Sequence, residues 1–402
     1  MPVGLTMPKH VSPVAGVRLA AVQSGIYGPA KRDLVLIELA EGSTTAAVFT
    51  QNRFCAAPVV VAKQHLSVTQ PRYLLINSGN ANAGTGAQGL ADAQRSCVLV
   101  AAQSNSEPEL VLPFSTGVIG QRLPVDKIDA ALPGAFSGLA KDAWLDAARA
   151  IMTTDTIPKV VSRQVETNGG DFSITGMAKG AGMICPNMAT MLAFVATDAA
   201  IDQASLVDLN QQLTEQSFNR ITIDGDTSTN DACVLIATGG AGQITKGSPA
   251  WSKFVATLLE VYQQLAQSIV RDGEGASKFV TVAVKGGYKD SDCEVVARSV
   301  AHSPLVKTAL FASDANWGRI LAAVGYAGIA LAIEKVSLVI NGVVIVQNGE
   351  PHPDYHEQLG ASAMANSEIE IEIELGQGSA RYRLWTSDLS YDYVSINADY
   401  RT

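Results

Sequence analysis

The sequence predicts an α+β fold in which sheets and helices form layers. Segments rich in Val, Ile and Leu follow one another early in the chain, whereas apolar residues at helical spacing are gathered in separate blocks. The two kinds of segment do not alternate in the regular strand–helix–strand rhythm of a parallel α/β fold. Near the end of the chain, polar and apolar residues alternate strictly, which is typical of a strand with one face in water.

The individual elements follow from these patterns. Strands are expected in short apolar segments at Asp33–Leu39, Thr45–Phe49, Pro58–Ala62, Tyr73–Ile76, Leu110–Phe114 and Lys278–Lys285. Helices are expected at Leu90–Gln103, Asp142–Met152, Gln203–Ser217 and Trp251–Val270. No repeat, low-complexity tract or obvious linker divides the chain. The two halves are therefore expected to share one fold or to pack closely.

The strictly alternating segment is followed at once by a second one. Glu368–Leu375 reads EIEIEIEL, and Ala380–Trp385 continues the alternation after two glycines, Gly376 and Gly378. Glycines between two alternating segments are typical of a β-turn. The pattern predicts an antiparallel hairpin made of these two strands.

Composition restricts the kinds of partner. Of the 402 residues, 47% are apolar and 17% are charged, which favours a large core over a disordered chain. The net charge is −9 and no block of Lys and Arg occurs, so a nucleic-acid partner is not expected. The five cysteines are widely spaced, which indicates a reducing compartment. Without a signal-like N-terminus or an apolar run of ~18 residues, we expect a cytoplasmic protein with no membrane partner.

One glycine-rich segment matches the consensus of a dinucleotide-binding motif but does not have the required position after a strand. Gly84–Gly89 fits G-x-G-x-x-G, but Asn77–Ala83 separates it from the preceding expected strand. In a dinucleotide site the first glycine stands at the end of the strand, so that the following helix begins at the pyrophosphate. We interpret the segment as a turn into a helix and keep a dinucleotide-binding protein as an alternative.

Two further motifs fail as metal sites. The segment beginning at Asp224 resembles a calcium loop, but Thr229 and Leu235 stand where Gly and Glu are required. His352 and His356 are four residues apart, but the residues between them do not form H-E-x-x-H. No metal and no cofactor are therefore expected.

The segment from Lys179 to Phe194 carries the chemistry. It reads KGAGMICPNMATMLAF, in which the small pair Ala189 and Thr190 interrupts an apolar run. Taken by composition, the segment is a buried strand with one β-branched threonine. The wider sequence changes this interpretation.

The segment resembles the self-cleavage region of the ornithine acetyltransferase family, the bifunctional glutamate N-acetyltransferases. Further similar blocks occur in order along most of the chain, namely NSGNANAGTG at 77–86, STGVIG at 115–120, DGDTSTND at 224–231, DGEGASK at 272–278, NWGRILAAVGYAG at 316–328 and YDYVSINADYRT at 391–402. The resemblance implies the layered fold of self-processing acyltransferases with an N-terminal nucleophile. It also implies cleavage between Ala189 and Thr190, which would give an α chain of residues 1–189 and a β chain of residues 190–402.

The residue types agree with this chemistry. A threonine hydroxyl is a weak nucleophile unless a base lies beside it. Cleavage before Thr190 would supply its own α-amine, with a pKa of ~8, as that base. Acyl transfer also develops negative charge on an oxygen and requires preplaced donors. By resemblance, the Thr116 hydroxyl and the Gly117 N–H form this oxyanion hole.

The resemblance also implies the substrates and their contacts. The substrate-binding residues would be Thr153, Lys179, Thr190, Glu274, Asn397 and Thr402. A lysine suits a carboxylate and a glutamate suits an ammonium. The implied reaction is ping-pong: N-acetylornithine acetylates Thr190, and glutamate then takes the acetyl group. Some members of the family also accept acetyl-CoA.

The sequence also predicts how the chains assemble, and it leaves one competing activity open. The resemblance implies a heterotetramer of two α and two β chains. A hydrolase on the same scaffold, an aminopeptidase or amidohydrolase with an N-terminal nucleophile, remains the alternative, since water can also resolve an acyl-enzyme.

Overall fold

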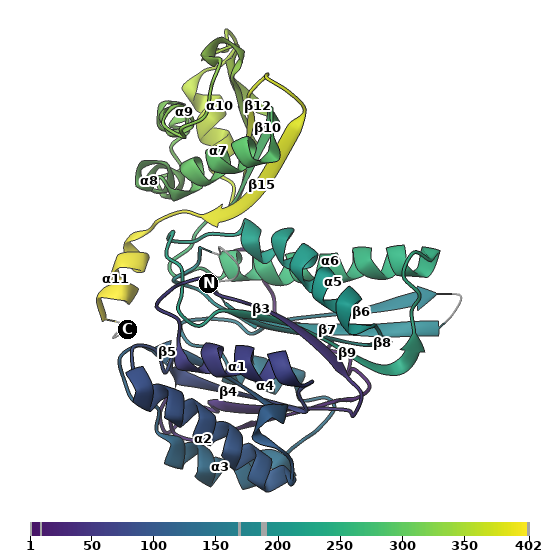
Figure 1. Ribbon diagram of the computed structural model, residues 1–402. Helices are drawn as coiled ribbons and strands as arrows, with labels where there is room; N and C mark the ends of the chain where they lie inside the picture. The colour runs from purple at the N-terminus through teal and green to yellow at the C-terminus, as the bar shows by residue number, and fades with distance from the viewer. Residues whose placement is uncertain (1, 9, 168–169, 186–190, 400–402) are drawn as a thin grey trace.

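A computed structural model describes residues 2–8, 10–167, 170–185 and 191–399. Its strands form three sheets, and helices cover their faces (Figure 1). The first sheet has the order β1-β2-β4-β5, with bounds Val17–Val22, Leu34–Leu39, Tyr73–Asn80 and Val111–Val118. The second has the order β3-β9-β8-β7-β6, with bounds Thr44–Phe49, Ala232–Gln243, Leu192–Ala200, Gly170–Lys179 and Lys159–Thr167.

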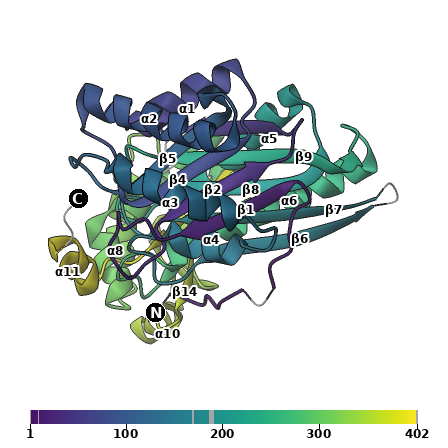
Figure 2. The ribbon, with the colours of Figure 1, turned by 90° about the horizontal axis from the view of Figure 1, so that it is seen from below.

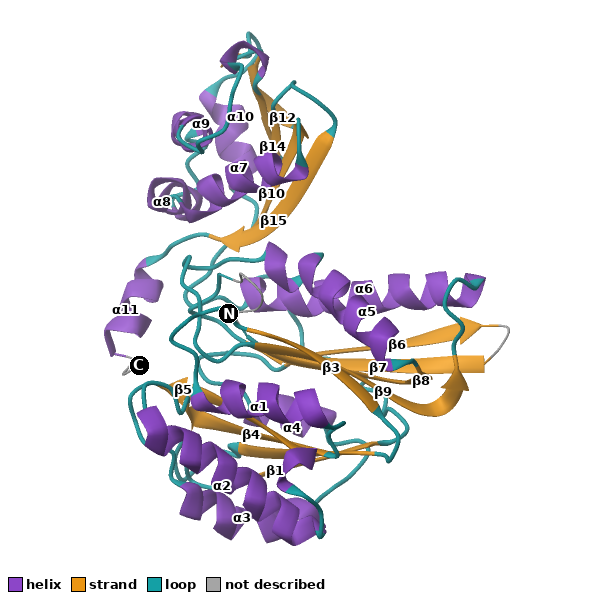
Figure 3. Ribbon diagram, in the orientation of Figure 1, coloured by secondary structure: helices purple, strands orange, loops and turns teal. Residues whose placement is uncertain are grey.

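These two sheets pack face to face as the inner layers of the molecule (Figure 3). Apolar side chains from both sheets form one core, in which the Phe114 and Phe194 rings meet edge to face with centroids 5.1 Å apart. Helix α4 (Trp144–Ala150) contributes the buried Trp144 to the same core. The expected α+β class with layered sheets and helices is confirmed.

Helices form the outer layers. Helices α2 (Gly86–Ser104) and α3 (Val125–Ser137) cover the free face of the first sheet, whose strands lie side by side in Figure 2. Helices α5 (Gln203–Glu215) and α6 (Pro249–Arg271) cover the free face of the second sheet. The helical periodicity predicted α2, α5 and α6, because an amphipathic helix is recorded in local sequence, but α3 was not predicted.

A third sheet lies beyond α6 and has its own core (Figure 1). Its order is β13-β12-β11-β14-β10-β15, with bounds Glu350–Pro351, Val343–Gln347, Ser337–Ile340, Glu368–Glu374, Phe279–Gly287 and Ala380–Ser387. Its helices are α7 (Asp290–His302), α8 (Pro304–Phe311), α9 (Trp317–Gly325) and α10 (Glu357–Met364). Helix α11 (Tyr391–Asp399) then leads back to the layered body.

The predicted hairpin near the C-terminus is wrong in its pairing. Both segments are strands, but β10 lies between them, parallel to β14 and antiparallel to β15. The connection crosses the end of β10, where the N–H groups of Gln377 and Gly378 donate to the carbonyl of Gly286 at 2.7 and 2.8 Å. The two glycines therefore belong to a connection that passes over the end of a third strand, and not to a tight turn between two paired strands.

The segment Pro58–Ala62 was also predicted wrongly, as a strand. It belongs to helix α1 (Ala57–Val68), and its proline stands in the first turn. Proline is well suited to that place, because the first N–H groups of a helix have no partner within the helix. The run of β-branched residues packs against β5 and α2, and this tertiary packing outweighs their preference for strands.

The glycine-rich segment before α2 forms a turn into that helix, as interpreted. Strand β4 extends four residues beyond the prediction, to Asn80. The Asn82 amide closes the turn by accepting from the Thr85 hydroxyl at 2.8 Å and donating to the Gly89 carbonyl at 2.9 Å. A Cβ at Gly89 would overlap the Thr85 side chain, so protein atoms fill the space at the start of the helix.

In the described part of the chain, no helix combines the length and the apolarity needed to cross a membrane.

Candidate active site

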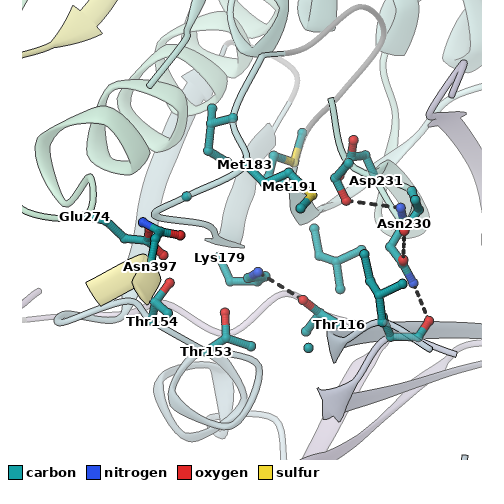
Figure 4. A pocket seen from close by; sticks show the side chains of 18 residues that line it. Thr116, Thr153, Thr154, Lys179, Met183, Met191, Asn230, Asp231, Glu274 and Asn397 are labelled. Carbon is teal, nitrogen blue, oxygen red and sulfur yellow. Dashed lines mark hydrogen bonds between the residues drawn. The ribbon is translucent and has the colours of Figure 1, made fainter. Parts of the chain in front are cut away.

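One pocket opens where the ends of the two inner sheets meet the loop after α6 and helix α11 (Figure 4). Strands β5 and β7, the loops after α4 and before β9, and the start of β8 all contribute to its wall. Its polar side chains include Thr116, Thr153, Thr154, Lys179, Ser228, Thr229, Asn230, Asp231, Glu274 and Asn397. In Figure 4, Glu274 and Asn397 lie at one end, Asn230 and Asp231 at the other, and Lys179 and Thr116 between them.

The pocket brings together six residues that the sequence singled out. They come from positions far apart in the chain, and all of them line the pocket: Thr116, Gly117, Thr153, Lys179, Glu274 and Asn397. Met191, the residue bonded to Thr190, also lines it. The remaining predicted residues, Ala189, Thr190 and Thr402, lie outside the described residues.

Thr116 and Gly117 lie near the end of strand β5 and line the pocket. Gly117 has φ +132°, and a Cβ there would lie 2.6 Å from the backbone nitrogen of Asn80 on the neighbouring strand. Glycine is therefore required by the close approach of β4 and β5. Thr116 is buried, at 7% exposed, and its hydroxyl accepts a hydrogen bond from Lys179 Nζ at 3.0 Å. Because that lone pair is engaged, the hydroxyl proton remains to be donated elsewhere.

Lys179 stands at the end of β7 and reaches across the pocket to Thr116 (Figure 4). Burial lowers the pKa of its ammonium, while the nearby carboxylates of Asp155 and Asp231 act in the opposite direction. The expectation was a cation that holds a substrate carboxylate. In the structure, the Lys179 ammonium donates a hydrogen bond to the Thr116 hydroxyl, which is the expected oxyanion donor. This contact polarises the Thr116 hydroxyl.

A buried ion cluster lies behind the pocket. Lys159 Nζ donates to Asp155 at 2.6 Å and to Asp272 at 2.7 Å, and these side chains are at most 1% exposed. Asp155 also accepts the backbone N–H groups of Gly180 at 2.7 Å and Thr153 at 3.0 Å. Burial alone would raise the pKa of Asp155, but Lys159, Lys179 and the Gly180 N–H hold it well below its ordinary value. The cluster fixes the backbone at two sides of the pocket.

Glu274 and Asn397 form the end of the pocket nearest α11. Asn397 donates its amide to Glu274 Oε2 at 2.7 Å and to the Tyr393 carbonyl at 3.0 Å. A Cβ at Gly182 would lie 2.5 Å from the Glu274 carboxyl carbon, so this glycine makes room for the glutamate. This end of the pocket therefore presents a carboxylate, which accepts hydrogen bonds, beside a side-chain amide.

Asn230 and Asp231 are among the residues of this pocket that were not predicted as site residues. Asn230 donates to the carbonyls of Ala81 at 2.6 Å and Ser115 at 3.0 Å, which ties the loop before β9 to the β5 end. Asp231 is 2% exposed, and within the described residues its Oδ2 has no hydrogen-bond partner. The signal for both was the block 224–231, which was considered as a calcium loop and as one block of the family resemblance, without a site role for either residue. Its first aspartate, Asp224, instead accepts the N–H groups of Met183 and Ile184 at 2.6 and 2.9 Å.

The layered fold and this pocket define an enzyme of the acyltransferase class, and comparison with known proteins supplies the family. The family model described as ArgJ family matches residues 18–402. The chain belongs to the ArgJ family, which confirms the resemblance stated from its sequence.

Three curated relatives are similar over nearly their full length. Each is called arginine biosynthesis bifunctional protein ArgJ. The protein of Psychrobacter arcticus is 53% identical over 99% of both chains. That of Methylococcus capsulatus is 54% identical over 98% of this chain and 97% of its own. That of Pseudomonas syringae pv. tomato is 52% identical over 100% of both.

Two solved structures match about half of the chain. The arginine biosynthesis bifunctional protein ArgJ of Bacillus halodurans is 39% identical, with a TM-score of 0.48, over 50% of this chain and 96% of its own. The ornithine acetyltransferase of Mycobacterium tuberculosis, complexed with ornithine, is 36% identical, with a TM-score of 0.39, over 44% and 94%.

Proposed function

We propose that this protein moves an acetyl group from N-acetylornithine to glutamate through an ester on Thr190. The observation that carries the proposal is the gathering of six predicted residues in one pocket that Met191 also lines. The relatives' names, which place them in arginine biosynthesis, support the same assignment.

The first half-reaction forms the ester. The Thr190 oxygen attacks the acetyl carbonyl, and its proton passes to the α-amine of the same residue. The carbonyl oxygen becomes negative and is stabilised by the Thr116 hydroxyl, which Lys179 polarises, and by the Gly117 N–H. The carbon–nitrogen bond then breaks, and the ornithine amine leaves with the proton.

The second half-reaction runs the same steps backwards with another amine. The glutamate amine attacks the ester and gives N-acetylglutamate, which restores the Thr190 hydroxyl. The two amino acids differ in side-chain charge, and the Glu274–Asn397 end of the pocket suits both. Glu274 accepts an ammonium, and the Asn397 amide donates to a carboxylate once it turns from Glu274.

Self-cleavage between Ala189 and Thr190 is the step that frees the α-amine. The fragments 1–189 and 190–402 would remain interleaved after the cut, because β7 pairs with β8 and β3 pairs with β9. The second sheet thus contains strands of both fragments. We extend the family's assembly to this protein as two copies of each fragment, which native mass measurement tests.

Intact mass and product analysis test the proposal together. The wild-type protein should give two fragments that meet at Ala189 and Thr190, and N-[14C]acetylornithine, labelled in the acetyl group, should label the fragment 190–402. The Thr190→Ala variant should remain one chain and stay unlabelled. Variant Thr257→Ala, on an exposed turn of α6, is the matched control and should behave as wild type.

The products separate transfer from hydrolysis. N-acetylglutamate should form only when glutamate is present, and acetyl-CoA is tested as donor in a parallel reaction. Acetate released at the same rate without glutamate would instead identify an amidohydrolase. Cleavage at the same bond in Thr190→Ala would contradict the nucleophile.

A further inference from the structure

Helix α11 carries the pocket residue Asn397 at the surface of the molecule (Figure 1). Within its range 391–399, all of which the structure describes, no residue is buried. Its first side chain, Tyr391, is 82% exposed and meets the Phe311 ring edge to face, with centroids 5.6 Å apart. A helix of nine residues is only marginally stable in water by itself. The contacts on the inner side of α11 therefore determine where Asn397 lies.

The first turn of α11 lies against the loop that carries Glu274. Gly275 has φ +68°, and a Cβ there would lie 2.6 Å from the backbone nitrogen of Tyr393. Glycine at this position therefore lets the two backbones approach each other directly. The Tyr393 N–H donates to the Ser390 hydroxyl at 3.3 Å, as in an N-cap. The start of the helix is thus fixed beside the Glu274 end of the pocket.

The Tyr393 side chain connects α11 to Asp224. Its hydroxyl donates to Asp224 Oδ2 at 3.3 Å. The same carboxylate accepts the backbone N–H groups of Met183 at 2.6 Å, Ile184 at 2.9 Å and Asp226 at 3.2 Å, which hold it in place. Burial and the charge of Asp224 raise the pKa of the Tyr393 phenol, so the hydroxyl keeps its proton and acts as the donor. Because Met183 lines the pocket, the helix is tied to an acceptor that the pocket's own backbone fixes.

Asn397 stands one turn after Tyr393 on the same side of α11. Residues four apart lie on one face of a helix, and the Asn397 amide donates to the Tyr393 carbonyl at 3.0 Å and to Glu274 at 2.7 Å. The backbone of Glu274 is held independently of α11, because its N–H donates to the Ala181 carbonyl at 2.8 Å. A displacement of α11 would therefore move Asn397 and leave Glu274 in place.

We propose that Tyr393 is a positioning residue that holds Asn397 in place for the acceptor substrate, glutamate. The proposal rests on the proposed function, in which Asn397 donates to the glutamate side chain and Glu274 accepts the ammonium of N-acetylornithine. Tyr393 acts through Asn397. By tying α11 to Asp224, it restricts the positions of Asn397 before glutamate binds, so less conformational freedom is lost on binding. The Tyr393 hydroxyl therefore contributes to the recognition of one substrate and not of the other.

Tyr393→Phe tests the assignment, because it removes the hydroxyl and keeps the ring. Tyr391→Phe is the matched control, since it makes the same change two residues earlier in the same helix, at an exposed position. In a ping-pong reaction, kcat/KM for each substrate reports its own half-reaction, so it is measured separately for N-acetylornithine and for glutamate. Asn397→Ala and the double variant complete a double-mutant cycle. Circular dichroism checks that each variant is folded.

We expect Tyr393→Phe to lower kcat/KM for glutamate by about 10-fold, which is typical for the loss of one hydrogen bond to a charged group. The value for N-acetylornithine should match that of the wild type. In the Asn397→Ala background the substitution should add little, because Tyr393 acts through the residue that is already removed. Tyr391→Phe should match the wild type with both substrates.

Three results would overturn the assignment. They are a wild-type kcat/KM for glutamate in Tyr393→Phe, equal losses for the two substrates, and a loss that is fully additive with that of Asn397→Ala. A wild-type protein that makes no N-acetylglutamate from N-acetylornithine and glutamate would instead contradict the proposed function on which the inference rests. The two failures are therefore distinguishable.

Discussion

The buried ion cluster behind the pocket and the wall of the pocket use the same residue types in opposite ways. Asp155, Lys159 and Asp272 are nearly inaccessible, and each carboxylate oxygen has a donor within the protein. In the wall, Asp231 has an oxygen without a donor among the described residues, and the Thr116 hydroxyl accepts a bond but keeps its proton to donate. Burial and charge alone do not distinguish the two regions. Unused hydrogen-bonding capacity distinguishes them, and it is found in the wall of the proposed active site.

The largest effect should follow from breaking the saturated cluster. Lys159→Met would leave two buried carboxylates without their cation. We expect the free energy of unfolding to fall by about 3–5 kcal/mol, because an uncompensated buried charge is strongly unfavourable. Urea denaturation followed by circular dichroism measures it. Lys253→Met is the control, since Lys253 is exposed and its ammonium donates to the Glu166 carbonyl. Equal stability of the two variants would show that the cluster is not structural.

The next effect concerns the pocket wall and should leave stability intact. Thr116→Val keeps the shape of the side chain but removes the hydroxyl. We expect kcat to fall by about 100- to 1000-fold, which is typical for the loss of one oxyanion donor. The melting temperature should stay close to that of the wild type, since the hydroxyl accepts only one described bond.

A double-mutant cycle shows whether Lys179 acts through Thr116. Lys179→Met should lower kcat in the wild type but add little in the Thr116→Val background, because the two residues share one interaction. Steady-state kinetics of all four proteins gives the coupling. Fully additive losses would mean that Lys179 acts on the substrate alone.

His302 is a buried side chain whose protonation depends on pH. Its Nε2 lies 3.1 Å from the Thr222 hydroxyl, and burial, aided by the charges of Arg298 and Lys307, lowers its pKa from 6.5 to about 4. The folded state therefore favours the neutral ring. The stability that this provides is complete above pH 6.5 and is lost as the pH falls from 6.5 through about 4.

The size of this pH effect can be measured. Between about pH 7.5 and about pH 5, the wild type should lose about 2 kcal/mol of unfolding free energy that His302→Gln does not lose. Urea denaturation of both proteins at the two pH values isolates the contribution of this residue. A difference between the proteins that is independent of pH would refute the assignment.

The sequence predicted the parts of this picture that are local or shared with a family. Periodicity found α5 and α6 because a helix buries one face of a continuous segment. It missed the pairing around β10, because the paired residues lie far away in the chain, as with Phe279 opposite Glu368 and Ser387. The resemblance supplied Thr116 and Glu274, which the residues alone would have assigned to a glycine turn after a strand and to the surface. The sequence did not identify Asp231 as a site residue, since its distinguishing feature is an absent hydrogen bond that only the three-dimensional arrangement reveals.

The smallest effect should appear at the Glu274 end of the pocket, where one carboxylate oxygen is already held by Asn397. Glu274→Gln removes the charge but keeps the shape and the contact. We expect the KM for N-acetylornithine to rise by about 10-fold with little change in kcat, because under the proposed function Glu274 binds the ammonium equally in the ground state and the transition state. The KM for glutamate should not rise, since its side chain is an anion. Glu260→Gln, on the exposed face of α6, is the control. A parallel rise in both KM values would mean that Glu274 shapes the pocket and does not discriminate between substrates by side-chain charge. Glu274 would then have a structural role, like the residues of the buried ion cluster.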